Sequence, residues 1–88
     1  MKVFAIYGVS SRGYTKVLGR GYMEVDSYEE AVKTCLTEME YDNVCDEDLE
    51  EWLEKERAGI YLYSNDPGDF VLVGEDVEEV MEVYEEYV

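Results

Sequence analysis

The carboxylates of this chain are confined to one part of the sequence. Residues 1–23 contain four basic residues and no acid, whereas residues 24–88 contain all 23 carboxylates and three basic residues. Charged side chains stay at the surface of a folded domain, so this division limits which segments can be buried. The net charge of −16 on 88 residues also far exceeds the roughly 2–8 units that keep a small domain soluble. We therefore expect the charge to serve a purpose beyond solubility.

Length and composition predict one small globular domain spanning residues 1–88. Apolar residues make up 47% of the chain, which is typical of a folded domain and not of a disordered acidic tail. No stretch approaches the roughly 20 apolar residues of a membrane span, and no signal-peptide pattern follows Met1. We expect a cytoplasmic protein that does not bind membranes.

Adaptation to high salt is an alternative explanation of the acidity. A halophilic surface would spread its acids around the chain, whereas here 23 consecutive residues carry none. The uneven distribution favours a specific acidic surface.

The acid-free segment predicts two antiparallel strands. Met1–Val9 is an apolar run rich in β-branched and aromatic residues, typical of a strand buried on both faces. Tyr14–Val25 follows a polar connection and predicts a second strand, bulged or weakened at Gly19 and Gly21.

The next segments predict two helices. Ser27 and Glu30 form a capping box, and the apolar residues after them follow a helical period. These residues are Ala31, Val32, Cys35, Leu36 and Met39. Asp46 predicts the N-cap of a second helix that ends near Arg57.

A hairpin and a last helix complete the chain. The strands Ile60–Tyr63 and Phe70–Val73 flank a type II turn at residues 66–69. Asp76 and Glu79 resemble a capping box, and the following apolar residues are Val77, Val80, Met81, Tyr84 and Tyr87. The predicted order is ββααββα, an α+β domain with three to four antiparallel strands and about three helices on one or both sheet faces.

The two later helices carry the candidate site. Like charges four residues apart, such as Glu78 and Glu82, each cost a few tenths of a kcal/mol. Glu85 and Glu86 lie at a helix C-terminus, where negative charge is unfavourable. The helix dipole explains only the acids at the helix N-termini, such as Asp46 and Asp76, so we expect the acidic helices to bind a partner. The candidate residues are Asp46, Glu47, Asp48, Glu50, Glu51, Glu54, Glu75, Asp76, Glu78, Glu79, Glu82, Glu85 and Glu86.

Their spacing matches a row of phosphates. Side chains three or four apart on a helix lie about 5–6 Å from one another, and successive phosphates of one DNA strand lie roughly 6–7 Å apart. The acidic helices therefore predict a partner that is a basic nucleic-acid-binding protein.

In charge, size and helix pattern, with acidic segments at Asp46–Glu56 and Glu75–Glu86, the chain resembles small phage or mobile-element inhibitors that mimic DNA. Anti-CRISPR, anti-restriction and uracil-DNA glycosylase inhibitors belong to this class. The resemblance implies a stoichiometric, non-enzymatic viral inhibitor that acts in the host cytoplasm. No shared motif transfers the role of an individual residue.

The basic N-terminal hairpin has a different role. Four positive charges are few beside 20 net negative ones, so direct nucleic-acid binding is not expected. These residues neutralise the acidic helices, flank a turn, or give the target a second contact. Candidates for a second contact are Arg12, Tyr14, Tyr41 and Asp42.

The sequence offers little for catalysis. The chain has no histidine, no glycine-rich phosphate loop and no metal-ligand spacing. We expect no enzyme activity, no cofactor and no metal site. An ordinary acidic interaction module or regulatory subunit, which binds a basic partner without copying nucleic acid, is the alternative.

Overall fold

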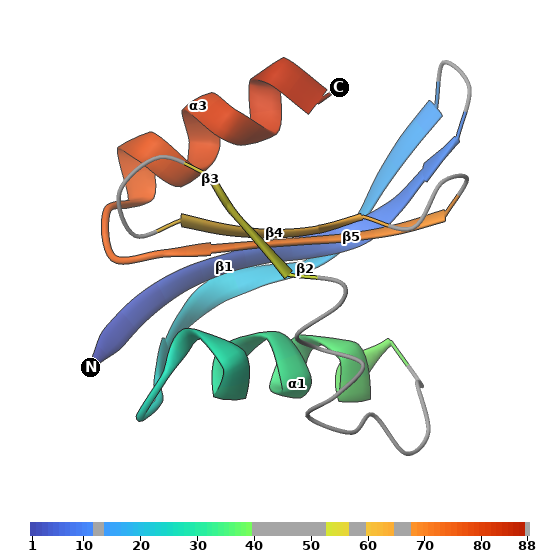
Figure 1. The fold of residues 1–88 in the computed structure, drawn as a ribbon. Helices are drawn as coiled ribbons and strands as arrows, with labels where there is room; N and C mark the ends of the chain where they lie inside the picture. Colours follow the sequence, from blue (N-terminus) through green and yellow to red (C-terminus); the bar gives the residue numbers. More distant parts are fainter. Residues whose placement is uncertain (12–13, 40–52, 57–59, 65–67, 88) are drawn as a thin grey trace.

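A computed structural model describes residues 1–11, 14–39, 53–56, 60–64 and 68–87. It shows an α+β fold in which one antiparallel sheet lies between two helices (Figure 1). The elements are β1 (Lys2–Ser11), β2 (Tyr14–Glu24), α1 (Tyr28–Glu38), β3 (Leu53–Glu56), β4 (Ile60–Ser64), β5 (Gly68–Gly74) and α3 (Val77–Tyr87).

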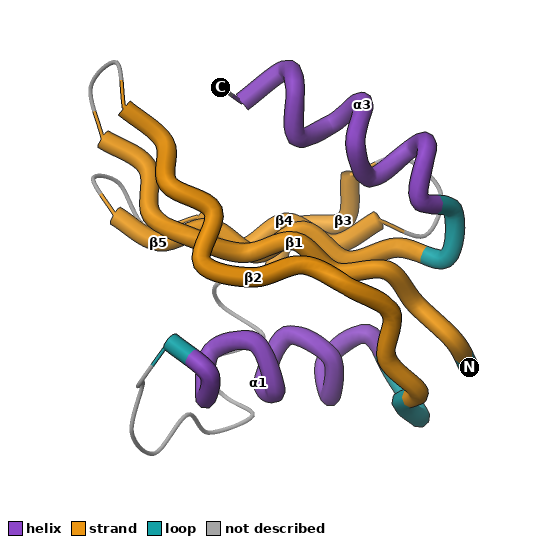
Figure 2. Tube along the Cα trace, turned by 180° about the vertical axis from the view of Figure 1, so that it is seen from behind, coloured by secondary structure: helices purple, strands orange, loops and turns teal. Residues whose placement is uncertain are grey.

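The sheet is built around β1. Its strand order is β2-β1-β5-β4-β3, and every neighbouring pair is antiparallel. β1 and β5 are the strands against which both helices mainly pack, β2 lies outside β1, and the backbone of β4 and β3 extends the sheet beyond β5. α1 and α3 lie on opposite faces of the sheet (Figure 2).

β1 is buried on both faces, as its sequence predicts. Successive side chains of a strand point to opposite faces, so Val3 and Ala5 face α1 while Phe4 and Ile6 face α3. β5 repeats the pattern, with Val71 and Val73 facing α1 and the two residues beside them facing α3. The result is two apolar layers separated by the sheet.

A β-bulge interrupts the pairing of β1 with β2. Tyr7 lies opposite Gly19, but Gly8 lies opposite Val17, so Leu18 is an extra residue on β2. The bulge predicted at Gly19 is therefore confirmed, whereas no bulge occurs at Gly21, which pairs in regular register with Ala5. A Cβ at residue 19 would overlap the ring of Tyr7 as it lies in this structure.

α1 begins at the predicted cap. The backbone N–H of Glu30 donates to Ser27 Oγ at 3.1 Å. Glu30 Oε2 accepts from the backbone N–H of Asp26 at 2.8 Å, one residue earlier than in a standard capping box. Four of the five predicted apolar residues are fully buried, and Met39 is half-buried.

The α+β class and the antiparallel sheet with helices are confirmed, whereas the predicted element counts are not. Leu53–Glu56 was expected at the end of a helix but is strand β3, paired with β4. The prediction was wrong there because it relied on local helix propensity, which pairing with a neighbouring strand overrides. The rest of the proposed helix, residues 46–52 and 57, and residues 66–67 of the predicted turn lie outside the described residues. The other two turn residues, Gly68 and Asp69, belong to strand β5, so the prediction of a turn over 66–69 was wrong for them.

Candidate functional site

The predicted acidic helix at the end of the chain exists as α3. Asp76 caps it, since Asp76 Oδ1 accepts from the backbone N–H of Glu78 at 2.9 Å. Val80 and Val83 are fully buried against the sheet, on the layer that contains Phe4 and Leu72. The sequence pattern had omitted Val83. This buried stripe fixes which side of α3 faces water.

The acids of α3 lie on its outward side. Six of the seven carboxylates between residues 75 and 86 are exposed, and the seventh, Glu79, is half-buried. The exposed residues are Glu75, Asp76, Glu78, Glu82, Glu85 and Glu86. The last turn contains no basic residue. We call these six residues the α3 acidic face.

A second group of acids lies at α1 on the other side of the sheet. Asp26, Glu29, Glu30 and Glu38 are exposed there, and Glu30 is occupied by its hydrogen bond to the Asp26 backbone. Because the sheet separates the two helices (Figure 2), their acids do not form one continuous row. A partner surface that lies against one face of the sheet therefore meets only one of the two groups.

The other candidate residues fall elsewhere. Glu54 lies on β3, so a helical phosphate row through residues 46–56 cannot include it. Tyr14 is exposed on β2. The remaining candidates lie outside the described residues: Arg12, Tyr41, Asp42, Asp46, Glu47, Asp48, Glu50 and Glu51.

The basic residues of the first hairpin gather along β2 and the start of β1. Lys2, Lys16 and Arg20 are exposed. Lys2 Nζ lies 4.8 Å from the centre of the Tyr22 ring, which packs edge-on against Phe4 at 5.3 Å. Such a cation–π contact is worth about 0.5–1 kcal/mol at an exposed site. Lys2 therefore has a local role in holding Tyr22.

β2 also has exposed apolar residues, which the sequence analysis did not find. Five large apolar side chains are exposed in the described part of the chain, and four of them belong to β2. They are Tyr14, Val17, Leu18 and Tyr22. The available sequence indication was the bulge, which disturbs the alternation of inward and outward residues.

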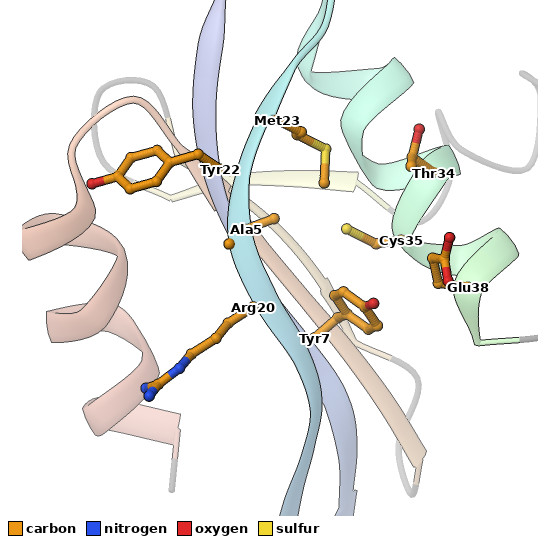
Figure 3. Close-up of a pocket in the computed structure, with 9 residues that line it drawn as sticks. Ala5, Tyr7, Arg20, Tyr22, Met23, Thr34, Cys35 and Glu38 are labelled. Carbon is orange, nitrogen blue, oxygen red and sulfur yellow. The ribbon is translucent and has the colours of Figure 1, made fainter.

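A pocket of about 220 Å³ lies between β2 and α1 (Figure 3). Tyr7, Met23, Cys35 and Glu38 line it. Burial, and then the charge of Glu38, raise the pKa of the Cys35 thiol to about 12. Burial also raises the pKa of Tyr7 above its usual 10.0, with smaller contributions from Cys35 and Glu38. Both groups stay protonated at neutral pH, so neither is an activated nucleophile.

Within the described ranges, no three His, Cys, Asp or Glu side chains come together as a metal site. No described helix combines the length and the hydrophobicity needed to cross a bilayer. No family model, curated protein or solved structure matches the chain.

Proposed function

We propose that this protein is a non-enzymatic, stoichiometric inhibitor of a nucleic-acid-binding defence protein, of the anti-CRISPR or anti-restriction type, and that it acts in the cytoplasm. It occupies the basic cleft of its target with the α3 acidic face. The observation that supports this proposal is that α3 buries one valine stripe, while the six carboxylates of the α3 acidic face, four on the helix and two just before it, are exposed to solvent.

The spacing of the α3 acidic face supports phosphate mimicry. Glu78 and Glu82 are one turn apart, and Glu85 is nearly one turn further. One turn of a helix rises about 5.4 Å, close to the roughly 6–7 Å between phosphates of one strand. A cleft that binds phosphates at this interval can place its lysines and arginines against these carboxylates.

The charge of the whole molecule supports the same mode of binding. A net charge of −16 attracts a basic surface at long range and speeds the encounter. Binding then resembles nucleic-acid binding in losing affinity as salt rises.

A competition experiment tests the proposal. The protein is used at low salt to capture a basic nucleic-acid-binding protein from host lysate, and the purified partner is loaded with a labelled DNA or RNA duplex. We expect the protein to release the duplex in proportion to the amount added. The triple variant Glu78→Gln/Glu82→Gln/Glu85→Gln should raise the concentration required by at least about tenfold, since each lost charge contact is worth up to about 1 kcal/mol.

A matched variant controls for net charge. Asp26→Asn/Glu29→Gln/Glu38→Gln removes three charges on the α1 side and should compete nearly as well as the wild type. Equal losses for both variants would show that only total charge matters. A partner that holds the duplex and this protein together would contradict mimicry and favour the acidic interaction module.

A further inference from the structure

The outer edge of β2 is an open sheet edge. β2 ends the strand order on one side, and no described strand pairs with its outer side. Such an edge presents unpaired N–H and C=O groups that can pair with another strand. Here it also carries four exposed apolar side chains.

The hydrogen bonds to β1 show which β2 residues point outward. The Met1 amino group donates to the Val25 carbonyl at 2.7 Å, and the Val25 N–H donates to the Met1 carbonyl at 2.9 Å. Hydrogen-bonded and non-hydrogen-bonded pairs alternate along antiparallel strands. Val25 therefore points its backbone groups toward β1, and Arg20, Tyr22 and Glu24 point theirs away from it.

The bulge limits the usable part of this edge. Leu18 interrupts the regular pairing of β2 with β1. The segment from Gly19 to Glu24, at the end of β2 that leads to α1, is therefore the regularly paired part of β2 on that side of the bulge. Along it, Arg20 and Tyr22 project toward the α3 side of the sheet, whereas Met23 projects toward the α1 side (Figure 3). Glu24 shares the α3 side with Tyr22, because it lies two residues further along the strand.

The charges of the segment Gly19–Glu24 indicate which strand can pair with this edge. Arg20 and Glu24 lie at equal distances on either side of Tyr22, so the segment is complementary to a reversed copy of itself. All of this segment except Glu24 also belongs to the 23 consecutive residues that carry no acid. Contact along this edge therefore joins two molecules of net charge −16 through a segment that contains one acid in each copy.

We propose that β2 pairs antiparallel with β2 of a second copy of this chain, with Tyr22 opposite its own equivalent and Arg20 opposite Glu24. The pairing is isologous about a two-fold axis at Tyr22. It forms about six backbone hydrogen bonds and two Arg20–Glu24 ion pairs, and it joins the two sheets into one. Shifting the register by two residues toward the bulge loses both ion pairs, and a further shift places Arg20 opposite Arg20.

The helices leave room for this contact. α1 and α3 pack mainly on β1 and β5, and Met23 of β2 reaches the layer of α1 only from the side of β2 that faces that helix. With strands about 4.8 Å apart, equivalent helices of the two copies lie about 19 Å apart. Packed helices need only 8–10 Å between axes, so neither pair of helices collides.

Sedimentation equilibrium of the full chain tests the dimer. The measurement is made up to about 1 mM protein, where weak association is detectable, and at about 0.5 M NaCl, where long-range repulsion is screened. We expect a species of twice the 10.2 kDa monomer mass. Arg20→Glu and Glu24→Arg should each weaken dimerisation by about tenfold or more, because like charges then lie opposite each other. The double swap Arg20→Glu/Glu24→Arg should restore it.

The double swap gives the decisive comparison. Arg20 and Glu24 of one strand are about 13 Å apart, so one can compensate for the other only across the interface. Lys16→Glu makes the same charge change beyond the bulge and should leave dimerisation unchanged. Circular dichroism confirms that each variant is folded. A monomer at every concentration would overturn the proposal, and so would a dimer that the single variants do not weaken or the double swap does not restore.

Discussion

At Gly8 and Gly19, where β1 and β2 pair, a side chain would meet neighbouring atoms at once. A Cβ at Gly8 would overlap the backbone carbonyl oxygen of Lys16 and lie 3.0 Å from Val17 Cα. At Gly19 it would overlap the ring of Tyr7, which is a side chain and can move. The two sites therefore differ in how a methyl group can be accommodated.

We predict that Gly8→Ala lowers the free energy of unfolding by about 1–3 kcal/mol or more, and that Gly19→Ala costs less. Urea unfolding of both variants measures the difference. In a Tyr7→Ala background the cost of Gly19→Ala should nearly vanish, while that of Gly8→Ala should persist. An equal cost for Gly19→Ala in both backgrounds would show that the Tyr7 ring is not the obstacle.

Cys35 makes stability depend on alkaline pH. Its thiol has a pKa of about 12 in the folded chain against 9.0 when unperturbed. The unfolded chain therefore releases this proton first, so the stabilising effect is complete below pH 9.0 and is lost as the pH rises toward 12. One such group changes the free energy of unfolding by up to about 1.4 kcal/mol per pH unit.

We predict that the unfolding free energy falls as the pH rises from 9.0 toward about 12, and that it falls less steeply in Cys35→Ala. The variant loses buried contacts at every pH, so the informative quantity is the slope and not the absolute stability. Urea denaturation at several pH values measures it, with Cys45→Ser as the background of both proteins so that only one thiol is present. Parallel pH curves would contradict the assignment.

At the scale of elements, the acids at the two ends of α3 should have opposite effects on folding. Negative charge is favourable near a helix N-terminus and unfavourable near a C-terminus, by about 0.3–1 kcal/mol. Glu78 lies in the first turn of α3, and Glu85 lies near its end; both are exposed. The same substitution at the two positions therefore separates the dipole effect from total charge.

We predict that Glu85→Gln raises the melting temperature by about 2–4 °C and that Glu78→Gln lowers it by a similar amount. Thermal unfolding followed by circular dichroism measures both. Two increases of equal size would mean that general repulsion, and not the helix dipole, dominates. An increase for Glu85→Gln would also show that this acid is retained at a cost to folding, as the proposed function requires.

The elements that the sequence predicts well are those with a strong local pattern. β1 is a continuous apolar run, α1 has a cap and a clear apolar stripe, and α3 repeats both features. The prediction for residues 53–56 was wrong because Leu53 is the single apolar residue of that strand. One apolar residue shows neither the helical period of 3.6 residues nor the strand period of two. Its place in the sheet is set by pairing with β4, which lies outside any local window.

The candidate site was predictable only in part for the same reason. The acids of α3 follow from one helix and its buried face. The edge of β2 depends on strand order, which places β2 outside β1, and no local pattern in residues 14–24 shows this. The predicted bulge indicates only that the alternation of inward and outward residues is disturbed, so the exposure of the four apolar residues was established only by the folded molecule.

The whole molecule carries a net charge of −16, and this charge opposes folding as well as self-association. Repulsion among exposed carboxylates on both faces destabilises the compact state. Salt screens it, with a Debye length that falls from about 30 Å at 0.01 M to about 10 Å at 0.1 M. We predict that the melting temperature rises as NaCl increases over this range, and that the rise is smaller in Asp26→Asn/Glu29→Gln/Glu38→Gln. A melting temperature that falls with salt would contradict the dominance of repulsion.

The direction of the salt effect also separates folding from function. Salt should stabilise the fold and the β2 dimer, but it should weaken the contact of the α3 acidic face with a basic target. Loss of target binding at high salt would then report the electrostatic contact itself, because the protein is at its most stable there.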